Sequence, residues 1–128
     1  MYGSNALNAY KNNSVNYAPK EQLLLMLVDG AVRFSKMARQ ALEEKNIIES
    51  HKNLVKVQDI FTELMITLDT SAGEWAKQLY NVYEFIKNRL FEINLKKDTK
   101  MMDELMPVIE DVRNTWHEAY ERSKGIRR

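Results

Sequence analysis

The chain has 128 residues, which is about the length of one domain and enough to bury a hydrophobic core. Lys and Arg number 19 against 18 Asp and Glu, so a net charge of +1 gives no electrostatic reason to expect nucleic acid or an anionic membrane as a partner. The absence of cysteine excludes a disulfide framework, a thiol nucleophile and a thiolate metal site, and it suits a reducing cytoplasm.

Residues 1–18 are rich in Asn and lack a sustained hydrophobic period, which predicts an arm and not a helix. They contain no basic start followed by an apolar core, as a secretory signal would. The apolar run Leu23–Val28 is far too short to span a bilayer. We therefore expect a cytoplasmic protein without stable membrane insertion.

Four amphipathic helices are predicted after the arm, because apolar residues recur at steps of three and four and glycine and proline are scarce. Their expected ranges are 19–44, 47–68, 74–96 and 98–124, with a tail at 125–128. Pro19 suits a first helical turn, and Asp98 suits the N-cap of the last helix. Helices of similar length with short connections predict an all-α fold, an antiparallel up-down four-helix bundle over residues 19–124 with the arm packing on it. The expected core positions are Leu23, Leu27, Ala31, Phe34, Ala38, Ala41, Leu54, Val57, Phe61, Leu64, Leu68, Trp75, Leu79, Val82, Ile86, Leu90, Ile93, Met102, Leu105, Ile109, Val112, Trp116 and Ala119.

Pro107 conflicts with the fourth helix, because an interior proline removes one backbone hydrogen bond and clashes with the preceding turn. The apolar stripe continues on both sides of it, so we expect one helix with a kink near residue 107. The alternative is a short turn over residues 98–105 followed by a new helix that starts at Pro107.

Catalytic and metal chemistry find no support in the sequence. A di-iron bundle needs Glu three residues before a core-facing His, but Ile48 precedes His51 and Asn114 precedes His117 at that spacing. The glycines are too isolated for a phosphate-binding loop, and most carboxylates fall between the apolar positions, as on a solvated helix face. We therefore predict no enzyme activity, no cofactor and no metal.

Surplus apolar surface is the remaining functional signal. Six consecutive apolar residues on a helix, Leu23–Val28, point in every direction, so one core cannot bury them all. Tyr80 and Tyr83 share a face offset from the core stripe of the third helix. A contiguous exposed apolar patch usually marks an interaction site, so a partner or the arm should cover these residues.

The sequence resembles the flagellar export chaperone FliS family over nearly its whole length. The resemblance rests on residues 8–15 (NAYKNNSV), 23–31 (LLLMLVDGA), 63–69 (ELMITLD) and 113–118 (RNTWHE), and on Leu79-Tyr80, Tyr83, Arg89-Leu90, Asn94 and Asp98. It implies a cytoplasmic helical bundle that binds the C-terminal segment of flagellin, prevents premature polymerisation and assists delivery to the flagellar type III export gate. It also implies an arm that lies where client otherwise binds, including the position matched by Tyr10.

The resulting hypothesis is an apolar track that the arm covers through Tyr10 and Val15 until client displaces it. The predicted client-binding or arm-covered residues are Tyr10, Val15, Leu24, Met26, Leu27, Val28, Tyr80 and Tyr83. Flagellin and the export gate protein are the implied partners. The sequence leaves open whether an anti-sigma factor, a co-chaperone or a second copy of the chain also binds. The alternative function is a homo-oligomeric helical adaptor or structural protein without a secretion client.

Overall fold

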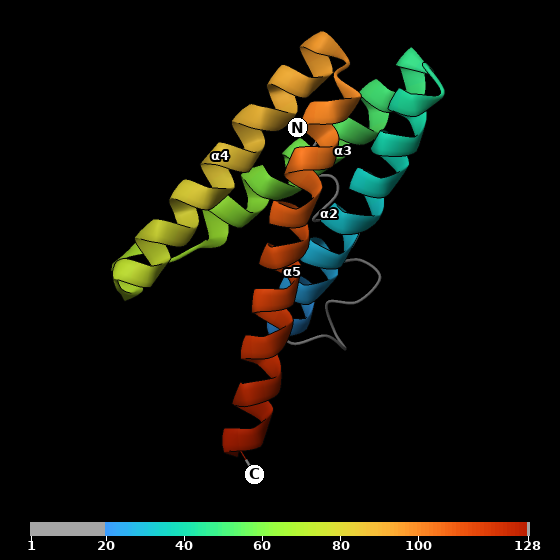
Figure 1. Cartoon of the computed structure of the whole chain (residues 1–128). Helices are drawn as coiled ribbons and strands as arrows, with labels where there is room; N and C mark the ends of the chain where they lie inside the picture. Colours follow the sequence, from blue (N-terminus) through green and yellow to red (C-terminus); the bar gives the residue numbers. More distant parts are fainter. Residues whose placement is uncertain (1–19, 128) are drawn as a thin grey trace.

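The computed structural model describes the backbone of residues 20–127 and the side chains of residues 20–124. It contains the helices α2 (Lys20–Glu43), α3 (Ile47–Thr67), α4 (Glu74–Lys96) and α5 (Thr99–Arg127), with a short 3-10 helix η1 (Thr70–Ala72) between α3 and α4. The predicted all-α four-helix fold is confirmed (Figure 1). The predicted arm, with Tyr10 and Val15, lies outside the described residues.

Each helix runs antiparallel to the next, and the packed pairs α2–α3, α3–α4, α4–α5 and α2–α5 close the bundle (Figure 1). One end, which we call the two-turn end, holds the turns at residues 44–46 and 97–98. The opposite end, the groove end, holds Lys20 and the connection at residues 68–73. Helices α4 and α5 pack less extensively than the other neighbouring pairs, and Figure 1 shows them diverging from the two-turn end toward the groove end.

Local capping explains where the helices begin and end at the two-turn end. The side chain of Asn46 accepts a hydrogen bond from the Glu49 amide at 3.1 Å, which caps α3. Asp98 accepts from the Met101 amide at 3.0 Å, so its predicted capping role for α5 is confirmed. Lys97, with φ of 52°, takes the left-handed conformation that often ends a helix and terminates α4.

The core follows the predicted stripes over most of their length. Nineteen buried apolar residues from all four helices form one cluster, in which Phe61 meets Tyr83 edge-to-face at 5.8 Å between ring centroids. Two expected core positions are wrong. Trp75 is 54% exposed because it lies in the first turn of α4, at the end where α4 and α5 have diverged. Ala119 is exposed because the last turns of α5 extend past the rest of the bundle (Figure 1).

Helix α5 is continuous through Pro107, from Thr99 to Arg127. The alternative of a new helix starting at Pro107 is therefore wrong, and the side chain of Pro107 lies at an exposed position. The kink itself stays a prediction. Residues 125–127 continue α5 where the sequence suggested a separate tail.

Candidate functional site

An apolar groove with a volume of about 550 Å³ lies at the groove end of the bundle. All of the elements that meet there contribute to it: α2, α3, η1, α4 and α5. Its apolar lining is Leu23, Leu24, Leu27, Leu64, Leu68, Ala72, Trp75, Tyr83 and Trp116. Lys20, Glu21, Thr67 and Asp69 add polar atoms to the lining. A volume of this size is typical of a ligand site, and the lining chemistry suits an apolar ligand.

Helix spacing sets the leucines of the groove in two antiparallel rows. Leu23 and Leu27 are four residues apart on α2, and Leu64 and Leu68 are four residues apart on α3, so each pair shares one face of its helix. Because α2 begins where α3 ends, the two rows lie at the same end of the bundle. The leucine surface of the groove is therefore built by the two helices that pack most extensively against each other.

Gly73 shapes the α4 side of the groove. Its φ of +151° is a conformation that residues with a side chain rarely adopt. A Cβ built at this position would come within 3.1 Å of the Trp75 ring. The glycine therefore allows both the turn into α4 and the position of Trp75 beside it.

Two aromatic side chains join α4 and α5 at the groove. Trp116 on α5 donates a hydrogen bond from Nε1 to the hydroxyl oxygen of Tyr83 on α4, at 2.7 Å. Tyr83 is only 1% exposed, and this burial raises the pKa of its hydroxyl to about 12. The phenol therefore stays neutral at physiological pH, and its polar atom has a partner.

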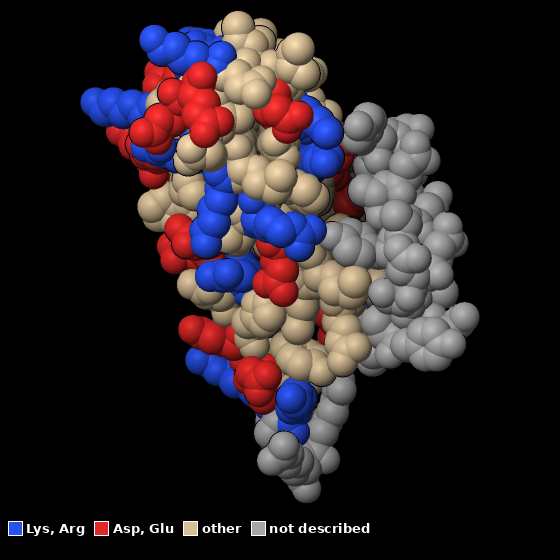
Figure 2. All heavy atoms as spheres, turned by 90° about the vertical axis from the view of Figure 1, so that its right-hand side faces the viewer, with Lys and Arg blue, Asp and Glu red and all other residues tan. Residues whose placement is uncertain are grey.

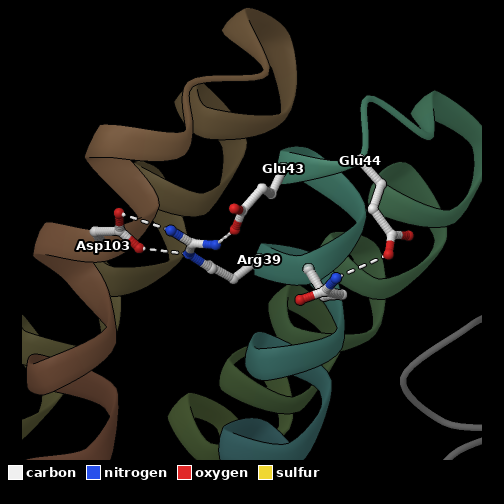
Figure 3. Close-up of polar contacts among 5 residues, drawn as sticks. Arg39, Glu43, Glu44 and Asp103 are labelled. Atoms are coloured by element: carbon white, nitrogen blue, oxygen red, sulfur yellow. Dashed lines mark hydrogen bonds and ion pairs between the residues drawn. The ribbon is translucent and has the colours of Figure 1, made fainter.

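Charged side chains connect α2 and α5 near the two-turn end, away from the groove. Arg39 on α2 donates from Nε to Oδ1 of Asp103 on α5 at 2.7 Å, and it also pairs with Glu43 one turn along its own helix (Figure 3). This hydrogen bond lowers the pKa of the Asp103 carboxyl. On the face that Figure 2 shows, basic and acidic side chains are interspersed, so no sign of charge dominates the described surface there.

The described residues offer neither a metal-binding cluster nor a membrane-spanning helix. No three His, Cys, Asp or Glu side chains in residues 20–124 come together as a metal site would require. None of the helices in this part of the chain combines the length and the apolar character needed to cross a membrane. His51 contacts Asn94, with 2.9 Å between their nitrogens, and His117 contacts Asp29 at 2.7 Å.

Comparison with known proteins decides the family. The family model described as Flagellar protein FliS matches residues 3–123. This chain belongs to the FliS family. A flagellar secretion chaperone FliS of Bacillus subtilis is 34% identical, over 96% of this chain and 92% of that protein. One from Vibrio cholerae is 31% identical, over 91% of this chain and 88% of that protein.

A structural comparison finds the same fold in a solved protein. A solved structure described as a crystal structure of a flagellar chaperone from bacteria matches with a TM-score of 0.73, covering 93% of this chain and 98% of that one. At 17% identity this likeness shows the fold alone. FliS is a family of chaperones and not of enzymes, so the predictions of family and of no enzyme activity are confirmed.

The structure brings together only part of the set of residues predicted for this FliS-family surface. Leu24, Leu27 and Tyr83 line the groove. Met26 and Tyr80 are half-buried and do not line it.

Val28 was expected at the surface, and this expectation is wrong. Its side chain is 1% exposed and belongs to the core cluster. Helix α2 packs against both α3 and α5, so the buried arc of α2 is wider than a single core stripe and includes Val28.

The groove role of the two tryptophans and of Leu64 and Leu68 was not predicted, because the helical spacing indicated core positions for all four. Both tryptophans of the chain line the groove; Trp75 lies in the first turn of α4, and Trp116 lies in the C-terminal half of α5. A large aromatic side chain at the end of an apolar stripe was the available signal. It could not be separated from core packing without knowing that α4 and α5 diverge.

Proposed function

We propose that this protein is a cytoplasmic export chaperone that binds the C-terminal segment of flagellin in the apolar groove. Binding prevents premature polymerisation of flagellin and assists its delivery to the flagellar type III export gate. The observation that carries the proposal is the groove itself, about 550 Å³ in volume and lined by leucines and aromatic rings. Its occurrence in a chain of the FliS family, whose relatives are named flagellar secretion chaperones, supports a flagellar protein as the client of the groove.

The physical mechanism is the ordering of an amphipathic segment against an apolar surface. A helix can place its apolar face into a hydrophobic groove through residues one turn apart, which matches the one-turn spacing of the groove leucines. A client that is disordered before binding loses conformational entropy when it orders, so apolar burial must offset that cost. The apolar face of flagellin that is buried in this way is then withheld from other flagellin subunits.

The arm is the proposed cover of the groove when client is absent. In this scheme Tyr10 and Val15 contact the apolar lining, and client displaces them. The cover limits self-association and lowers the apparent affinity for client by the fraction of molecules in which the groove is closed. Leu24, Leu27 and Tyr83 are the shared contacts in the groove, while Met26 and Tyr80 contact client beyond it and Val28 supports the groove from the core.

Delivery requires that client and export gate are held at the same time. The export gate protein is therefore expected to contact a surface outside the groove. An anti-sigma factor, a co-chaperone and a second copy of this chain are the other candidate partners.

Co-purification with the host's flagellin tests the proposal. Full-length flagellin should form a defined complex with the chaperone, and flagellin without its C-terminal segment should not. Retained binding of the shortened flagellin would contradict the proposed mode. A protein that forms the same homo-oligomer with and without flagellin would instead support the alternative of a structural adaptor.

A further inference from the structure

The hydrogen bond between Tyr83 and Trp116 lies where α4 and α5 diverge. Within the part of the chain that the structure describes, it is the one side-chain hydrogen bond that joins these two helices. Tyr83 is also in edge-to-face contact with Phe61 on α3, so a line of three rings crosses from α3 through α4 to α5. The position of the Trp116 ring on α5 is thus tied to the core of the opposite helices.

Trp116 differs from Tyr83 in its exposure. Both residues line the groove, but Tyr83 is buried and Trp116 is half-buried. An indole N–H at the wall of an apolar groove must find an acceptor, because an apolar ligand would remove its water without replacing the hydrogen bond. The Tyr83 hydroxyl is that acceptor, and it holds the indole with its N–H turned into the protein.

We propose that Tyr83 and Trp116 are positioning residues that fix one wall of the groove and keep that wall free of unpaired polar atoms when client binds. The inference rests on the proposed function, in which the groove takes an apolar helix face. The hydrogen bond between Tyr83 and Trp116 then stabilises the client complex more than it stabilises the free protein. Without Tyr83's hydroxyl, water can solvate the Trp116 N–H while the groove is empty, but client strips that water away.

Tyr83→Phe removes the acceptor and keeps the ring that packs on Phe61. The probe is a synthetic peptide of the C-terminal segment of the host's flagellin, with affinity measured by calorimetry on the full chain. We expect Tyr83→Phe to weaken binding by about five- to tenfold, since an unpaired N–H is then buried in the complex. The equilibrium constant for unfolding of the free protein in urea should change by a smaller factor.

Tyr120→Phe is the matched control, because it deletes the same hydroxyl on α5 at a position that does not line the groove. The Tyr120 hydroxyl accepts a hydrogen bond from Gln22 at 3.3 Å, so this variant also removes an acceptor, but it should bind the peptide as the parent protein does. The double variant Tyr83→Phe with Trp116→Phe removes acceptor and donor together. Its loss should therefore be smaller than the product of the two single losses. Equal binding by Tyr83→Phe and the parent, or strictly multiplicative losses, would overturn the inference.

An NMR measurement without client separates this inference from the proposed function. The chain has two tryptophans, so Trp75→Phe leaves the Trp116 indole N–H as a single signal. Adding Tyr83→Phe should move that proton upfield and speed its exchange with water. Adding Tyr80→Phe, which deletes a hydroxyl one turn earlier on α4, should change neither the chemical shift nor the exchange rate. An unchanged signal would overturn the inference, whatever the peptide does. Failure of the parent protein to bind the peptide, with the indole signal shifting as expected, would contradict the proposed function alone.

Discussion

The two ends of the bundle enclose different surfaces, although side-chain hydrogen bonds join helices at both. At the two-turn end, polar side chains connect neighbouring helices, with Arg39 bound to Asp103 and His51 in contact with Asn94. At the groove end, leucines and aromatic rings surround an apolar space of about 550 Å³. Since α4 and α5 are held together at the first end and diverge toward the second, the angle between them determines the groove (Figure 1).

The comparison shows how a small bundle can hold a stable core and an apolar binding surface together. Most of the core cluster lies away from the groove, because among the described residues only Leu27, Leu64 and Tyr83 belong both to the cluster and to the groove lining. Residues that hold the helices together should therefore affect stability, and residues that line the groove should affect client binding. The following variants test that division.

Leu90→Ala should have the largest effect on stability. Leu90 is 0% exposed on α4, and a buried Leu→Ala change costs about 2–5 kcal/mol through lost burial and the cavity that remains. Leu24→Ala is the matched change in the groove, where the side chain is half-buried, and it should cost less. Urea denaturation of both variants measures the difference. Equal losses would break the distinction between core and groove.

Trp75→Ala should show the reverse pattern. Its exposed ring lines the groove, so truncation should weaken binding of the flagellin peptide by about 2 kcal/mol, roughly 30-fold, while the unfolding free energy changes by less than about 0.5 kcal/mol. Phe91→Ala is the control on the same helix, because Phe91 is 57% exposed and does not line the groove. Calorimetry should show that Phe91→Ala binds the flagellin peptide with the same affinity as the parent protein. A similar loss in that variant would argue against the groove as the binding site.

Gly73→Ala should have an intermediate effect on both properties. The added Cβ meets an unfavourable φ and approaches the Trp75 ring, so we expect a loss of about 1–2 kcal/mol of stability. Displacement of Trp75 should also weaken peptide binding and change tryptophan fluorescence. Thermal unfolding and emission spectra provide the measurements, with the exposed Ala72→Gly as the neighbouring control for flexibility. Unchanged stability in Gly73→Ala would show that the connection adapts more readily than the geometry indicates.

Arg39→Gln should have the smallest effect, and it should depend on pH and salt. Arg39 lowers the pKa of Asp103 below its ordinary 3.8, so the pair stabilises the fold above that pH and loses its contribution as the pH falls through the folded-state pKa. Both groups are exposed, so salt should screen the effect. In urea titrations, the unfolding free energies of variant and parent should differ less at pH 2.5 than at pH 7. The same difference at both pH values would exclude the ion pair as its cause.

The helical pattern predicted most of the fold from the sequence. The steps of three and four identified buried residues such as Leu54, Ile86 and Ile109, because each helix of a bundle turns one stripe toward a common core. Capping by Asp98 was also predictable, since it depends only on neighbouring residues. The burial of Asp59 could not be predicted in this way. Its Oδ2 atom is buried without a hydrogen-bond partner, and this depends on how closely the surrounding helices approach.

The candidate site was predicted in part. Leu24, Leu27 and Tyr83 were selected and line the groove, but Trp75 and Trp116 were assigned to the core. Periodicity gives the direction in which a side chain points from its own helix. It does not give the distance to the next helix, which decides whether that side chain meets a neighbour or an open groove.

The sequence by itself determined four amphipathic helices, the membership of a chaperone family and an excess of apolar side chains, because these follow from local spacing and residue type. Only the tertiary structure decided where the excess lies. Helix divergence turned the ends of the apolar stripes into a groove, the double packing of α2 buried Val28, and the approach of α5 to α4 paired Trp116 with Tyr83. These outcomes depend on the angles and distances between helices, which arise from all the contacts of the bundle at once.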